Sequence, residues 1–251
     1  MKKITLIICM IATVILLTGC SENSILKDND EHKDNITDLI IPEQEINDVV
    51  MNYYQLKLDL GEGYEVTQID NYIIVNDLKS KTVKEYEVTV YKTKEFGDKY
   101  LVLAKCYDKD GHPSCELLLL QKTDDKYTVL KTAVGDIPMS MAFAVNRAVY
   151  ENNTILFSVL GDRTWSVGSP DESKEVSFYY IIVEFENGES IKETVTGDKG
   201  YIIVLESISD VKDMKLYNAE GELQTSLADL DKYGSRGRDS EFSSVEKYFN
   251  D

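Results

Sequence analysis

The chain of 251 residues is poor in histidine, which occurs only at positions 32 and 112. Catalytic triads and dyads built on histidine need a base with a pKa of about 7 beside a nucleophile. Zinc sites rich in histidine need several such ligands. His32 lies in a polar segment near the N-terminus, and His112 lies in a turn between predicted strands. We therefore expect no histidine-based catalytic site, no metal site and no cofactor.

Positive charge is also scarce, with 27 basic residues against 45 acidic ones and a formal net charge of −18. Arginine occurs only at positions 147, 163, 236 and 238. Because an acidic surface repels nucleic acid and anionic headgroups, nucleic acid is excluded as a partner. A basic polymer, a divalent cation or a basic protein patch would fit better, although acidity also simply keeps an exposed protein soluble.

No apolar run is long enough to cross a bilayer. The longest run, from Ile4 to Leu17, follows the basic residues Lys2 and Lys3. At 1.5 Å per residue it spans roughly 21 Å as a helix, which is less than a hydrocarbon core of about 30 Å. A basic start followed by a short run without a polar face is typical of a secretory signal peptide.

The apolar run ends in Leu17-Thr18-Gly19-Cys20, which resembles the lipobox of bacterial lipoproteins. The resemblance implies a signal peptide over residues 1–19, cleavage before Cys20, and a diacylglycerol thioether on Cys20 that carries palmitate-like chains. Two or three such chains suffice for stable anchoring. Cleavage also removes two lysines and leaves a net charge near −20. We expect a lipoprotein on the extracytoplasmic face of the cell membrane. Its wealth of Asn, Ile, Lys and Tyr is typical of low-GC Gram-positive bacteria.

The first part of the mature chain divides into a tether and a helix. Residues 20–41 are polar and charged, so we expect a flexible tether after the lipidated cysteine. Ile46, Val50 and Tyr53 then recur at helical spacing, which predicts a helix over residues 42–58.

Short period-two patterns follow the helix. They predict strands at 65–69, 72–76, 83–93, 100–107, 115–122 and 127–134. Residues 42–136 are therefore expected to form an α+β domain whose N-terminal helix packs on a curved antiparallel sheet. The order of elements resembles the NTF2-like and cystatin-like folds. Because the resemblance is one of element order only, it implies no activity.

Residues 137–229 show strand patterns at about ten-residue spacing, which favours a small all-β sandwich. The predicted strands are 142–149, 153–160, 176–185, 190–195, 201–207 and 214–217. Asn187-Gly188 is a strong hairpin signal between two of them. The arrangement resembles Ig-like sandwiches by element order. Residues 230–251 are polar again and are expected to form a C-terminal tail.

Cys106 and Cys115 flank the turn residues Asp110-Gly111. A two-residue turn there would place the cysteines opposite each other at a non-hydrogen-bonded pair, within reach of a disulfide. A loop of three or four residues would break this register and leave two free buried thiols. Asp108-Lys109-Asp110-Gly111 also begins like a calcium loop, but the glycine and glutamate that the pattern requires further on are missing.

The longest predicted loop between strands, residues 161–170, contains Arg163 and the single Trp165. Both residue types are favoured at binding hot spots, so the loop is a candidate binding site. The alternative is that Trp165 belongs to the core or plugs the edge of a sandwich.

These features predict a lipid-anchored, non-catalytic binding or interaction protein of the cell envelope, with an envelope protein or polymer as its unknown partner. The rival hypothesis is an envelope enzyme that uses paired carboxylates on a glycan or a similar substrate. A deep pocket that holds two partly buried carboxylates would favour the enzyme.

Overall fold

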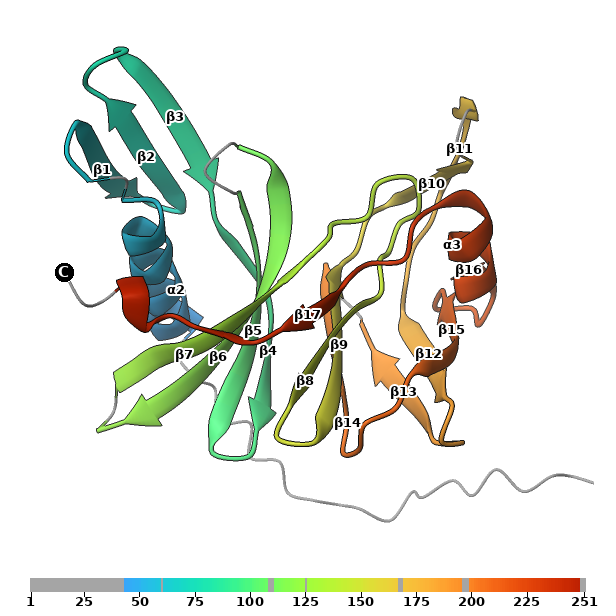
Figure 1. Ribbon diagram of the computed structural model, residues 1–251. Helices are drawn as coiled ribbons and strands as arrows, with labels where there is room; N and C mark the ends of the chain where they lie inside the picture. The colour runs from blue at the N-terminus through green and yellow to red at the C-terminus, as the bar shows by residue number, and fades with distance from the viewer. Residues whose placement is uncertain are drawn as a thin grey trace, which may run out of the picture. The chain divides into compact units, whose positions relative to one another are not determined.

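The computed structural model describes residues 43–59, 61–107, 111–124, 126–166, 169–195 and 199–248, apart from the side chains of residues 43 and 165–172. The described part is mostly β, with several sheets and two α-helices (Figure 1). Residues 41–251 belong to one compact unit. The domain boundary expected after residue 136 lies inside this unit, between strands β7 (Lys126–Gly135) and β8 (Asn146–Tyr150).

The helix predicted over residues 42–58 is observed as α2 (Glu43–Lys57). Its apolar stripe is fully buried at Val50, Tyr53 and Tyr54. These side chains share a core cluster with β-sheet residues such as Val102. Because a short helix gains most of its stability from such packing, the stripe rather than local propensity accounts for α2.

Two sheets follow α2 in the chain. The smaller one contains β1 (Tyr64–Ile69), β2 (Tyr72–Asp77) and β3 (Thr82–Glu87). The larger one, named here the helix-side sheet, contains β4 (Thr89–Phe96), β5 (Lys99–Tyr107), β6 (Pro113–Thr123), β7 (Lys126–Gly135) and β18 (Ser243–Ser244). The single strand predicted over residues 83–93 is therefore wrong. It is divided at Val88, which is buried between β3 and β4, and its two parts belong to different sheets.

Both faces of the helix-side sheet are covered. Along β6, Leu118 and Leu120 lie in the cluster that contains α2, whereas Leu117 and Leu119 lie in a second cluster. Successive side chains of a strand point to opposite faces, so a strand buried on both sides needs a continuous apolar run. The four consecutive leucines of β6 meet this requirement.

Two further sheets face each other in a sandwich-like arrangement. The middle sheet contains β8 (Asn146–Tyr150), β9 (Asn153–Val159), β14 (Gly200–Leu205) and β17 (Asp239–Glu241). The outer sheet contains β12 (Tyr180–Phe185), β13 (Ser190–Thr194), β15 (Val211–Tyr217) and β16 (Leu223–Ser226), and it leads into α3 (Leu227–Tyr233). A separate two-stranded ribbon is formed by β10 (Arg163–Ser166) and β11 (Ser169–Glu175).

The middle sheet also has two buried faces. Leu156 of β9 packs in the core shared with the outer sheet. Its neighbours Ile155 and Phe157 pack in the core shared with the helix-side sheet, next to Leu103 and Leu117. Residues from both sides of the expected domain boundary therefore contribute to one hydrophobic cluster.

The C-terminal strap, defined as residues 235–248, lies within the segment expected to be a polar tail, residues 230–251, and includes ordered elements. It adds β17 to the middle sheet beside β8 and β18 to the helix-side sheet beside β7. It then ends in the 3₁₀ turn η1 (Glu246–Tyr248), near α2 (Figure 1). Val245 is 2% exposed in the core that contains α2. Open sheet edges offer unpaired backbone groups, which explains how so polar a segment becomes ordered.

Candidate functional site

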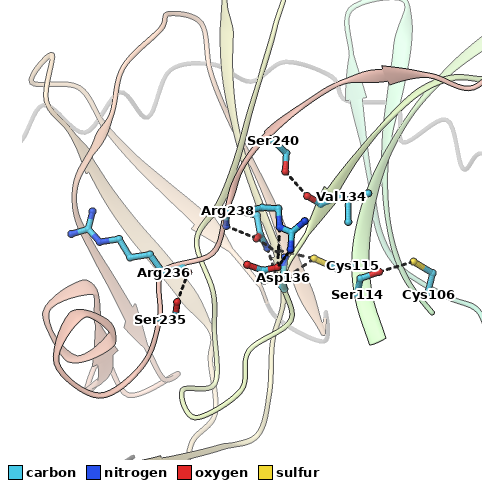
Figure 2. Close-up of polar contacts among 10 residues, drawn as sticks. Cys106, Ser114, Cys115, Val134, Asp136, Ser235, Arg236, Arg238 and Ser240 are labelled. Atoms are coloured by element: carbon cyan, nitrogen blue, oxygen red, sulfur yellow. Dashed lines mark hydrogen bonds and ion pairs between the residues drawn. The ribbon is translucent and has the colours of Figure 1, made fainter. Parts of the chain in front are cut away.

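Cys106 and Cys115 lie on opposite faces of the helix-side sheet. Cys106 pairs with Ser114 across β5 and β6, and Cys115 pairs with Lys105. The last pair before the turn is Tyr107 with Pro113, so the connection is longer than the two residues that a disulfide would require. Both cysteines are free and buried, and Figure 2 shows their sulfur atoms with separate partners. The predicted disulfide is therefore wrong, and the alternative of two buried thiols describes the protein.

Burial makes both thiols poor nucleophiles. Burial, followed by the nearby charge of Glu116, raises the pKa of Cys106 to about 11. Burial raises the pKa of Cys115 to about 12. Because the thiolate is the reactive form, neither cysteine is suited to catalysis near neutral pH.

Arg163 and Trp165 lie in strand β10 rather than in an irregular loop. Arg163 is exposed, pairs with Glu175 across the ribbon, and donates from its guanidinium to that carboxylate at 3.3 Å. The side chain of Trp165 lies outside the described residues, so its proposed binding role stays a prediction. Cys20 and His32 also lie outside the described residues, and His112 occupies an exposed position just before β6.

Sequence reasoning missed a buried polar cluster between α2 and the helix-side sheet. Glu116 of β6 is 1% exposed, and Lys57 from the last turn of α2 donates to both of its carboxylate oxygens, at 3.0 and 2.8 Å. Tyr53 donates to the same carboxylate at 3.2 Å, and the Cys106 thiol does so at 3.6 Å. The sequence feature that could have revealed this cluster is Glu116 itself, a charged residue directly before the apolar run Leu117–Leu120.

The ionisation of this cluster does not favour catalysis. Burial by itself would lower the pKa of Lys57, but the adjacent carboxylate of Glu116 outweighs it, and the pKa is raised. Burial and the charge of Glu116 also raise the pKa of Tyr53 well above its usual range. A protonated lysine cannot act as a nucleophile, and the cluster is better explained as a paired buried charge that fixes α2 on the sheet.

A groove of about 680 Å³ lies beside α2. Three segments line it: the first turns of α2, the turn between β1 and β2, and the corner between β3 and β4. Its lining residues are Gln44, Asn47, Asp48, Val50, Met51, Gln68, Asp70, Asn71, Val88, Thr89 and Val90. A volume of this size suits a small-molecule ligand.

Local sequence determines how the groove is built. Ile69 pairs with Tyr72, so Asp70 and Asn71 form a two-residue turn. Asp70 has a φ of 51°, a left-handed conformation that aspartate and asparagine tolerate better than most residues. The main-chain oxygen of Asn71 accepts from Val88 N at 2.8 Å, which holds the turn against the β3–β4 corner. A backbone hydrogen bond thus joins two of the three segments that line the groove.

Similarity to known proteins gives no assignment for this chain. No protein-family model matches the chain, and neither a curated protein nor a solved structure resembles it significantly. Within the described residues there is no group of three or more potential metal ligands. No helix in the same part of the chain is long and apolar enough to span a membrane.

Proposed function

We propose that this protein is a lipid-anchored binding protein of the bacterial cell envelope, and that the groove beside α2 is its ligand site. The main support for a binding role is the shape and lining of the groove. It is concave, and it combines an apolar floor with polar side chains that point toward one another. Val50, Met51 and Val88 form the floor, all at 5% exposure or less. Such a combination is typical of ligand sites in proteins.

The anchor is supported by the lipobox-like sequence that ends at Cys20. In this proposal the lipid on Cys20 holds the protein on the extracytoplasmic face of the membrane, and residues 21–41 connect it to the folded part. Cys20→Ala should abolish incorporation of labelled palmitate and release the protein from membranes. Equal labelling of the variant and the wild type would contradict the anchor.

Binding is favoured over catalysis by the exposure of the acidic groups. The two carboxylates of the groove, Asp48 and Asp70, are both exposed. Glycan hydrolysis by paired carboxylates requires one carboxyl group whose pKa is raised by its surroundings, usually by burial. In the described part of the chain, the one buried carboxylate is Glu116, which is paired with Lys57 and does not line the groove.

We further propose that the chain contains two modules, one that binds the ligand and one that supports it. In this view residues 42–136 are an α+β module in which α2 packs on a curved antiparallel sheet, and residues 137–229 are a small β-sandwich module. All residues that line the groove belong to the first segment. The sandwich would then act as its support.

The binding role can be tested by blocking the groove. Asn47 is half-buried and lines the groove, whereas Asn52 is exposed on the same helix and does not line it. We expect Asn47→Trp to fill the groove and Asn52→Trp to leave it open. Ligand-observed NMR with a panel of alkylamines, sugars, amino acids and carboxylates should find compounds that bind the wild type and Asn52→Trp but not Asn47→Trp. The absence of any such compound from the panel would contradict the groove as the binding site.

A further inference from the structure

We infer that the ligand of the groove is an alkylammonium group, that is, a primary amine at the end of an aliphatic chain. This inference rests on the proposed function and specifies its ligand. Three properties of the described groove lead to it: the sign of its charge, the orientation of its amides and the nature of its floor.

The charged groups that line the groove are all acidic. Asp48 on α2 and Asp70 in the β1–β2 turn contribute carboxylates, and no lysine, arginine or histidine lines the groove among the described residues. The whole chain also carries a net charge of −18. A cation would therefore be attracted both by the protein at a distance and by the two carboxylates on contact.

The amide side chains of the groove reinforce this preference. Gln44 donates from Nε2 to Asp48 Oδ1 at 2.9 Å, and Asn71 donates from Nδ2 to Glu87 Oε1 at 3.4 Å. Each bond uses the donor side of the amide, and the side-chain carbonyl oxygen is left as an acceptor. These two carbonyl oxygens and the carboxylates of Asp48 and Asp70 are all acceptors, and an ammonium group, which has three donors and no acceptor, is their complement.

The floor of the groove selects for an aliphatic stem. Val50, Met51, Val88 and Val90 line it, and among the described residues no aromatic side chain does. Sugar sites commonly use an aromatic ring as a stacking platform, which this lining lacks. Methylene groups gain by contact with valine and methionine, since burial of apolar surface is favourable whatever its shape. An amine with several methylenes therefore fits the groove better than a sugar or a bare metal ion.

Matched probes can isolate the ammonium group. We would titrate the whole ectodomain with butylamine and with butan-1-ol, which share the aliphatic stem. Two natural sources of the same chemistry are then compared: spermidine as a free polyamine, and Nα-acetyl-lysine methylamide as a lysine side chain in a peptide. We expect butylamine to bind and butan-1-ol to bind at least about tenfold more weakly, in line with two exposed ion pairs. Whichever of spermidine and the lysine derivative binds more tightly identifies the source.

Charge-matched variants test the two carboxylates. Asp48→Asn/Asp70→Asn removes both, and asparagine tolerates the left-handed conformation of residue 70. Glu186→Gln/Glu220→Gln, at two exposed positions outside the groove, changes the net charge by the same amount. We expect the first variant to weaken amine binding about tenfold and the second to change it less than about twofold. Added salt should weaken the binding of amines to the wild type.

The outcomes separate this inference from the proposed function. Equal binding of amine and alcohol, or equal binding by the two charge-matched variants, would overturn the alkylammonium ligand. A second outcome is that a sugar or a carboxylate binds, that Asn47→Trp blocks this binding, and that the amines do not bind. The groove would then be a binding site, as proposed, but its ligand would not be an alkylammonium group. If no probe shows binding that Asn47→Trp blocks, both fail.

Discussion

At the scale of single residues, Glu116 shows how a charge can be placed inside an apolar strand. Its neighbours on the same face of β6, Leu118 and Leu120, belong to the hydrophobic core. An unpaired carboxylate at this position would be costly because burial removes its hydration. Lys57 reaches it from the last turn of α2, where a cation also interacts favourably with the helix dipole. The pair therefore links the position of α2 to the register of β6.

Removal of Lys57 alone should be more damaging than removal of both charges. We expect Lys57→Met to lower the free energy of unfolding by about 3–5 kcal/mol, since Glu116 is left buried without a cation. The double variant Lys57→Met/Glu116→Gln should recover a large part of this loss. Urea denaturation of the four proteins in the double-mutant cycle gives the comparison. Additive losses would contradict the interaction between the two side chains.

The buried thiols should make the protein sensitive to alkaline pH. Because the folded-state pKa values of Cys106 and Cys115 are raised to about 11 and about 12, the native state favours the protonated thiols. Their contribution to stability is complete below a pH of about 9 and is lost as the pH rises through 11 and 12. The free energy of unfolding should therefore fall more steeply above pH 9 in the wild type than in Cys106→Ala/Cys115→Ala. The double variant keeps every tyrosine, so the tyrosines affect both proteins alike. Equal slopes of unfolding free energy against pH would therefore contradict the prediction.

At the scale of elements, Asn146 connects three segments that are far apart in the sequence. It is fully buried at the start of β8. Its Oδ1 accepts from the main-chain nitrogens of Asp136 at 2.8 Å and Arg238 at 3.2 Å. Its Nδ2 donates to the main-chain oxygen of Asp136 at 2.9 Å and to Cys115 Sγ at 3.4 Å. Figure 2 shows Asp136, Arg238 and Cys115 close to one another.

Two glycines allow the backbone to approach this asparagine. A Cβ atom on Gly135 would lie 2.6 Å from Asn146 Cγ, and one on Gly237 would lie 2.5 Å from Asn146 Oδ1. Neither glycine has a left-handed φ, so space rather than backbone conformation requires it. The C-terminal strap can therefore join the middle sheet only because residue 237 has no side chain.

Gly237→Ala should consequently destabilise the protein by about 1–3 kcal/mol, the usual cost of overpacking. The neighbours include the main-chain carbon of Val145 at 2.7 Å, which cannot simply rotate away. Gly161→Ala provides a control, because its Cβ would meet nothing closer than 3.5 Å. Thermal unfolding of both variants measures the difference, and a Gly237→Ala protein as stable as Gly161→Ala would contradict the proposed close contact.

At the scale of the whole molecule, contacts of several kinds join the described residues on either side of residue 136. The first is the hydrophobic cluster between the helix-side and middle sheets. The second is the C-terminal strap, which pairs with a strand of each sheet. The third is Glu193 of β13, which lies 3.4 Å from Lys92 and 2.9 Å from Lys94 of β4. The hydrophobic cluster should dominate, because partly exposed ion pairs contribute little.

We therefore expect residues 41–251 to unfold in a single transition. Hydrogen exchange in increasing denaturant should show β6 of the helix-side sheet and β15 of the outer sheet losing protection together, because a shared core couples them. Deletion of residues 239–251 should lower the midpoint for both strands. Separate midpoints for β6 and β15 would instead support the two domains that the sequence pattern suggests.

The sequence alone predicted α2 and most strands, since helical and period-two patterns are properties of neighbouring residues. It also indicated a β-rich protein with sandwich-like sheets. It could not predict the division at Val88, because that depends on which sheet each half joins. Nor could it predict the ribbon around Arg163, because strand pairing in a polar segment leaves no apolar pattern.

The sequence determined the local elements of this protein, and tertiary structure decided its chemistry. A register that differs by one residue from the predicted one moves a side chain to the opposite face of a sheet, which is why Cys106 and Cys115 are separated. The Lys57–Glu116 pair and the groove that contains Asp48 and Asp70 join residues from different elements. Such contacts have no signature in residue spacing, since packing in three dimensions alone determines which distant side chains meet.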